Sequence, residues 1–128
     1  MEVCLKYKKN QFSKTKKEII KNFIFFLNSE FPLRKKVEIL FTEVSDVGMT
    51  TGSNKKGIIK VLANGRMLID VLRTLAHEWI HEHQFQYGRK KTNQDVGGPD
   101  EDEANAEAGK LLKMFTKNNP NKEDKMYE

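Results

Sequence analysis

Cysteine and histidine are both scarce in this sequence. Cys4 is the single cysteine among 128 residues, and there are three histidines. An intrachain disulfide and a CxxC metal or redox pair are therefore excluded. Any metal site has to be built from His, Asp and Glu side chains.

Long apolar runs are missing as well. The most apolar stretch, residues 19–31, is interrupted by polar and charged residues such as Lys21 and Glu30, whereas a membrane-spanning helix needs roughly 18 apolar residues in a row. Residues 1–17 are basic but lack the apolar core and the cleavage site of a secretory signal. We expect a cytoplasmic location and no membrane partner.

The net charge of +5 is distributed unevenly along the chain. Residues 1–36 carry ten Lys or Arg against three Glu, while Asp100–Gly109 carries five acids and no base. A basic end can bind nucleic acid by charge attraction, or it can be a solvated helix face. We favour the solvated face, because the lysines lack interleaved aromatics and no nucleic-acid motif is present.

Hydrophobic periodicity and turn residues predict five elements in an α+β fold. The expected elements are a helix Lys14–Ser29 with Ser13 as N-cap, strands Val37–Val44 and Gly57–Ala63 as a two-stranded unit, a helix Met67–Tyr87 and a helix Asp100–Phe115. The residues between the strands are expected to be a floppy connection, and Asn64-Gly65 a turn. We expect one domain, residues 1–128, with a loose polar tail from about Lys117.

The central predicted helix contains an HExxH motif, His77-Glu78-Trp79-Ile80-His81. Spacing of four residues puts both imidazoles on one helix face, where they can bind one zinc ion. Glu78 can reach a zinc-bound water and take its proton as general base while the hydroxide attacks a carbonyl. We predict His77 and His81 as metal ligands and Glu78 as the catalytic residue.

A third protein ligand is needed, because catalytic zinc sites use three side chains. The C-terminal third has no His, so the candidates are the acids that begin the last predicted helix. Glu103 and Glu107 share a face, and we assign Glu103 to the metal and Glu107 to the second nitrogen of a ligand histidine. Glu107 or Glu101 as the ligand, with Glu103 in a capping box with Asp100, are the alternatives.

These residues resemble the gluzincin branch of the zincin metallopeptidases, in which HExxH lies on one helix and a Glu, commonly followed by Ala, on the next. Glu103-Ala104 fits that pattern, and Glu107 falls where thermolysin-like enzymes carry an acid that orients a ligand histidine. The string from His77 to Gln84 is also similar to the HExxHxxQ form of small bacterial and phage metallopeptidase-like proteins, which carry an ExEA segment downstream. The resemblance implies a minimal zincin-like domain with one Zn²⁺.

Residues around the motif have more ordinary expected roles. Gln84 shares the face of His81, and we expect it to contact a ligand residue or the substrate. Trp79 lies on the apolar stripe and is expected in the core. His83 lies across the helix and is expected to be solvated or hydrogen-bonded. Tyr87 and the oxyanion-stabilising residue of gluzincins are left unassigned.

The sequence therefore predicts a small zinc-dependent peptidase. Its expected partner is a peptide or protein substrate, which binds along Gly57–Ala63 as an edge strand above the metal. Two alternatives stay open: a non-enzymatic, zinc-stabilised basic protein that binds nucleic acid through residues 6–36, and a latent peptidase whose cleft is blocked. The sequence specifies neither the oligomeric state nor the substrate.

Overall fold

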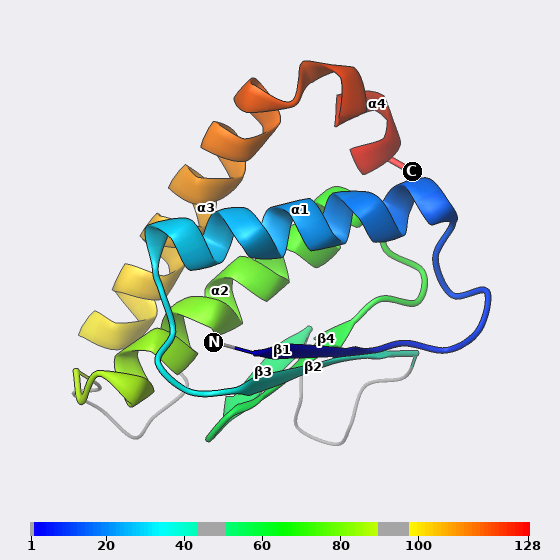
Figure 1. Ribbon diagram of the computed structural model, residues 1–128. Coiled ribbons are helices and arrows are strands. Elements are labelled where there is room, and N and C mark those ends of the chain that lie inside the picture. Colours follow the sequence, from blue (N-terminus) through cyan, green and yellow to red (C-terminus); the bar gives the residue numbers. More distant parts are fainter. Residues whose placement is uncertain (1, 44–50, 90–97) are drawn as a thin grey trace.

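The computed structural model describes residues 2–43, 51–89 and 98–128 and has an α+β fold, as predicted (Figure 1). The elements in chain order are β1 (Val3–Lys6), α1 (Lys14–Glu30), β2 (Val37–Thr42), β3 (Gly52–Lys55), β4 (Ile58–Leu62), α2 (Leu68–Gln86), α3 (Pro99–Asn118), a 3₁₀ turn η1 (Pro120–Lys122) and α4 (Glu123–Met126).

The four strands form one mixed sheet in the order β1-β2-β4-β3. Strand β2 pairs in parallel with both β1 and β4, and β3 is antiparallel to β4. Successive side chains of a strand point to opposite faces, and in β2 Val37, Ile39 and Phe41 are buried while the residues between them are not. The helices lie on the side of the sheet that these buried side chains face (Figure 1).

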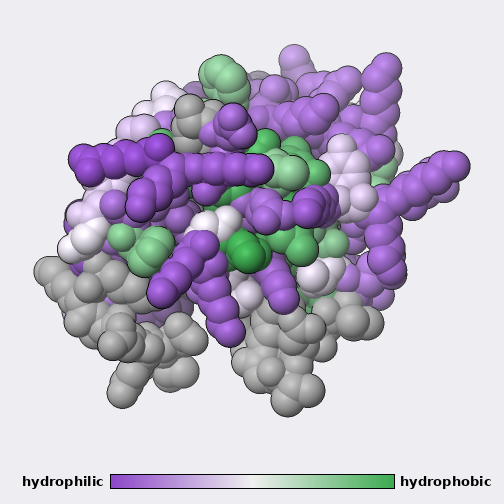
Figure 2. Space-filling view, turned by 60° about the horizontal axis from the view of Figure 1, so that its bottom comes forward, coloured by the Kyte–Doolittle hydropathy of each residue, from purple (hydrophilic) through white to green (hydrophobic). Residues whose placement is uncertain are grey.

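The opposite face of the sheet bears no helix among the described residues. By the strand alternation, Leu40, Leu62 and the 40% exposed Ile58 belong to this face. Figure 2, in which the sheet side is turned forward, shows an apolar area flanked by hydrophilic side chains. In the described ranges no helix combines the length and apolar character that crossing a bilayer requires.

The three long helices agree closely with the predicted ones because their apolar stripes are local patterns. Ser13 caps α1 as expected, its hydroxyl accepting a hydrogen bond from Lys16 N at 3.2 Å. Phe23 of α1 meets Phe115 of α3 edge to face, with ring centroids 4.9 Å apart. The most buried of the helices is α2, with Trp79 wholly inside and its Nε1 donating to Phe31 O at 2.9 Å.

The two predicted strands are present as β2 and β4 and pair with each other, but the expectation that they form the whole sheet is wrong, because the sheet has two further strands. Strand β1 lies in the basic N-terminal segment, and β3 lies in the expected floppy connection. Strand β4 is therefore an inner strand, and β3 is the edge above α2. Lys56 and Gly57 both have positive φ, +35° and +88°, which is the two-residue type I′ turn that joins twisted antiparallel strands.

A buried carboxylate fastens this hairpin to α2. Glu82 is 1% exposed, and its Oε1 accepts hydrogen bonds from Asn54 Nδ2 and Gly57 N, both at 2.8 Å. Its Oε2 accepts from Gln86 Nε2 at 2.7 Å. The polar sequence of β3 is thus held in place by contacts with a helix that lies much later in the chain.

The expected loose tail from about Lys117 is also wrong. Helix α3 continues to Asn118, and α4 follows after the 3₁₀ turn. Met126 is fully buried and belongs to the hydrophobic core. Leu68 N, at the start of α2, donates to Glu128 O at 3.2 Å. The buried Met126 side chain and this hydrogen bond hold the tail against the rest of the domain.

Candidate metal centre

His77 and His81 face the same way from α2, one helical turn apart. Their Nε2 atoms are 3.2 Å from each other, and the rings meet edge to face. The α2 residues that precede each histidine, Ala76 and Ile80, are fully buried in the core. The HExxH spacing therefore brings the two imidazoles together as predicted.

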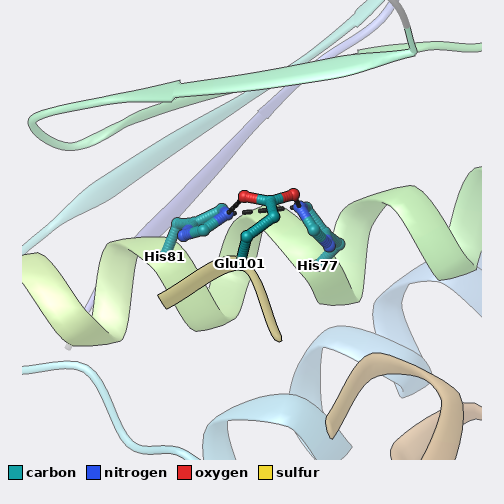
Figure 3. Close-up of side chains that lie close together, drawn as sticks. All are labelled: His77, His81 and Glu101. Carbon is teal, nitrogen blue, oxygen red and sulfur yellow. Dashed lines mark hydrogen bonds and ion pairs between the residues drawn. The ribbon is translucent and has the colours of Figure 1, made fainter. Parts of the chain in front are cut away.

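Glu101, from the first turn of α3, completes the group (Figure 3). Its Oε1 lies 2.7 Å from His77 Nε2, and its Oε2 lies 2.9 Å from His81 Nε2. Each of the three side chains is less than one-fifth exposed, at 17%, 11% and 19% for His77, His81 and Glu101. The ligand atoms lie within 4.8 Å of one another, so the three residues could hold a metal ion.

The chemistry of these atoms fits a cation. A carboxylate oxygen only accepts hydrogen bonds, and a neutral imidazole has one nitrogen without a proton. Burial lowers the pKa of His77 from its ordinary value, and the charge of nearby Glu101 opposes that shift. The neutral ring favoured by burial is the form that binds metal.

The third residue at this group is Glu101, where we expected Glu103. The Glu103 carboxylate instead accepts hydrogen bonds from Gln84 Nε2 at 2.7 Å and from Arg89 Nη1 at 3.1 Å to each of its oxygens. Residues two apart on an α-helix point about 200° apart, so Glu101 and Glu103 cannot share one side of α3. The assignment of Glu103 to the metal is corrected accordingly.

A pattern in α3 could have indicated Glu101. The buried residues Ala104, Ala108, Leu111 and Phe115 follow alternating spacings of four and three, and three residues before Ala104 is Glu101. The carboxylate thus extends the stripe that packs on α2. The alternative capping box of Asp100 and Glu103 is not formed either, since Gly98 is the N-cap and makes no side-chain cap.

Glu103 has a different environment from the one expected. Burial disfavours its charged form, but hydrogen bonds from Gln84 and Arg89 together with the Arg89 charge outweigh burial and lower the pKa of Glu103. Within the described ranges, Glu107 forms no hydrogen bond with either histidine. The role expected for Glu107 belongs to another side chain at His81: Gln84, whose Oε1 lies 2.9 Å from His81 Nδ1.

Glu78 lies between α2 and the edge strand β3 and is 7% exposed. A Cβ atom added at Gly52 would be 3.2 Å from Glu78 Oε2 and 2.5 Å from Thr74 Cγ2. The carboxylate of Glu78 therefore points at the β3 backbone, where the missing side chain of Gly52 leaves it space. Glu78 is the neighbour of His77 in the motif, whereas Glu82, the other buried carboxylate of α2 beside a candidate ligand, is taken up by hydrogen bonds from Asn54, Gly57 and Gln86.

The aromatic and basic side chains after the motif form a second cluster, which shares Arg89 with the Glu103 contacts. His83 stacks on Tyr87 with ring centroids 4.2 Å apart, and Arg89 Nη2 lies 2.8 Å from His83 Nδ1. Burial, followed by the Arg89 charge, lowers the pKa of His83. Tyr87 donates to Pro32 O at 2.8 Å. His83 is thus hydrogen-bonded, in keeping with its expected ordinary role.

Comparisons with protein-family models, with curated proteins and with solved structures gave no match to this chain. The resemblance to the gluzincins accordingly stays a prediction from the residues, while the His77, His81 and Glu101 group rests on its geometry.

Proposed function

We propose that this protein is a zinc-dependent peptidase. The observation that carries the proposal is the convergence of His77 Nε2, His81 Nε2 and the Glu101 carboxylate, with Glu78 following His77 in α2. Two imidazoles and one carboxylate form a typical ligand set of catalytic zinc sites, which leave a fourth position for water or substrate. When bound, zinc would polarise a carbonyl and lower the pKa of water.

The side chains of this protein would supply the rest of the reaction. Glu78 would accept a proton as general base and pass it to the leaving amine, a role that contributes about 10²- to 10⁴-fold in rate. Its burial against β3 keeps bulk water away from the carboxylate. His77, His81 and Glu101 would hold the ion and would not exchange protons with the substrate.

Strand β3 is the edge at which an extended peptide would bind. This strand replaces Gly57–Ala63 in the role that we expected, because β4 is paired on both sides. An edge strand offers unpaired backbone groups, to which a peptide adds as a further strand. Gly52 lies on β3 over Glu78, so a peptide bound along the edge would run past the base.

The basic-protein alternative has less support from the described residues. Lys6 Nζ pairs with Glu38 at 2.7 Å, and Lys8 Nζ pairs with Glu43 at 3.2 Å. These pairs neutralise part of the charge that nucleic-acid binding would use. A cytoplasmic location, in keeping with the unpaired Cys4, is part of the proposal.

The test combines metal analysis with peptide cleavage. Protein purified without added metal should carry one zinc per chain, and a mixed peptide library followed by mass spectrometry should show cleavage products. Glu78→Gln should keep the zinc and lose cleavage by about 10²-fold or more, since an amide does not accept the proton. Glu107→Gln, which changes a carboxylate away from the group, is the matched control and should behave as the native protein.

Two outcomes would contradict the proposal. The first is a protein that takes up no stoichiometric metal even when zinc is supplied, because the ligand group would then be a set of hydrogen bonds only. The second is cleavage that persists in Glu78→Gln, which would point to another base or to a contaminating protease.

A further inference from the structure

A continuous line of hydrogen bonds connects Arg89 to His81. Arg89 Nη1 contacts both oxygens of Glu103 at 3.1 Å, and Glu103 Oε1 accepts from Gln84 Nε2 at 2.7 Å. Gln84 Oε1 then lies 2.9 Å from His81 Nδ1. The line begins at Arg89, just after the end of α2, passes through Glu103 of α3 and returns through Gln84 to His81 of α2, a candidate ligand.

The amide of Gln84 has one orientation that satisfies its neighbours. Its Nε2 faces two oxygens that can only accept, Glu103 Oε1 and the backbone Asp100 O at 3.0 Å. Turning the amide over would place Oε1 against both of them, and Gln84 is 1% exposed, so water could not relieve the conflict. The amide oxygen must therefore face His81.

This orientation places a proton on Nδ1 of His81. An amide oxygen cannot donate, so His81 Nδ1 has to be the donor. His81 Nε2 lies 2.9 Å from Glu101 Oε2, which also can only accept, so a cation has to lie between these two atoms: a proton in the metal-free protein, or a metal ion in its place. With Nδ1 keeping its proton toward Gln84, Nε2 is the nitrogen whose lone pair a metal ion would take.

We propose that Arg89 and Glu103 are positioning residues that act through Gln84 to hold His81 in the tautomer that binds metal through Nε2. The inference rests on the proposed metal site. It gives Glu103 an indirect role: as an ionic acceptor anchored by Arg89, it fixes the Gln84 amide. The backbone supports the same arrangement, because Arg89 N donates to Gln84 O at 2.7 Å and brings the guanidinium back toward α3.

The experiment compares Glu103→Ala, Glu103→Gln and the control Glu107→Ala in two measurements. The first records long-range ¹H–¹⁵N spectra of histidine-labelled protein loaded with zinc. We expect His81 of the native protein to be protonated at Nδ1 and bound to zinc through Nε2, and we expect a tautomer mixture in Glu103→Ala. Glu103→Gln should restore the native spectrum, because its amide oxygen can still accept from Gln84.

The second measurement is zinc affinity by competition with a chelating dye. Loss of an outer hydrogen-bonding partner typically weakens metal binding 10- to 100-fold, and we expect about 10-fold for Glu103→Ala. Glu103→Gln should stay within about threefold of native and Glu107→Ala within about twofold. Should Glu103→Ala not fold, Gln84→Met removes the amide with little change in length and should produce the same tautomer mixture.

The proposal is overturned if native His81 is protonated at Nε2, or if Glu103→Ala leaves both the tautomer and the zinc affinity unchanged. A loss of thermal stability without either change would mark Glu103 as merely structural. The spectra need no substrate. A native protein that binds zinc but cleaves no peptide would therefore refute the proposed peptidase function, while the spectra would still decide the role of Glu103. A native protein that binds no zinc would refute both proposals.

Discussion

Gly52→Ala is a sharp test of how closely β3 lies on α2. The added Cβ would be 2.5 Å from Thr74 Cγ2 and 3.1 Å from Glu78 Cγ, and the first distance is far inside van der Waals contact. Thr74 cannot easily turn away, because its Oγ1 accepts from Arg66 Nη2 at 2.8 Å and faces Thr51 Oγ1 at 3.5 Å. A β-branched side chain in a helix also has few alternative rotamers.

The strand must therefore move away from the helix, which loosens the packing around Glu78. Overpacking of this kind costs about 1–3 kcal/mol of unfolding free energy. For a chain of this length, 1 kcal/mol corresponds to about 4 °C in Tm, so the expected loss is about 4–12 °C. Zinc affinity should stay near native, since the candidate ligands lie on α2 and α3.

The assay is thermal and urea unfolding of the native protein, Gly52→Ala, Thr74→Ser and the double variant. Thr74→Ser removes the obstructing methyl group but keeps the hydroxyl. Adding Gly52→Ala to Thr74→Ser should therefore cost much less stability than adding Gly52→Ala to the native protein. Ser53→Ala, whose side chain points to the other face of the sheet by alternation, is the control. A Gly52→Ala protein that melts within about 1 °C of native would refute the close approach.

Three further predictions concern the rest of the molecule. Met126→Ala should lower the unfolding free energy by about 2–5 kcal/mol, the usual cost of emptying a core site; an unchanged urea midpoint would contradict the docked tail. Glu82→Ala should cost about 2 kcal/mol or more by stranding Asn54 and Gly57 N, and faster amide exchange at Gly57 would report it. Because the pKa of His83 is lowered, the unfolded chain takes up a proton more readily below pH about 6.5. The metal-free protein should therefore lose stability as pH falls from there through the lowered pKa, and His83→Gln should flatten part of that slope in pH-dependent unfolding.

The parts of the fold that follow from neighbouring residues could be predicted. The stripes of α1, α2 and α3 repeat within a few turns, so their positions were predicted closely. Strand β3 has the sequence GSNK, which has low strand propensity, and it owes its place to β4 and Glu82. Strand β1 likewise depends on parallel pairing with β2 across the whole of α1.

The candidate site divides in the same way. His77 and His81 are brought together by the pitch of one helix, which the sequence states directly. The identity of the third residue depends on where α3 begins and on which side of α3 packs against α2. The sequence pattern of a Glu followed by Ala led to the prediction of Glu103 as this residue. The stripe through Ala104 and Ala108, continued one turn toward the helix start, leads to Glu101 instead.

The strand order also has a consequence for how the chain folds. The β3–β4 hairpin is the one strand pair of the described sheet that is joined by a short turn, whereas β1–β2 and β2–β4 pairing closes long loops. Closing such loops costs conformational entropy before the stabilising strand contacts have formed, and this cost slows folding. The two histidines of α2 emerge from the ribosome about 20 residues before Glu101. A nascent chain can therefore present the two imidazoles early, whereas the group that could hold a metal ion is completed only when α3 packs on α2.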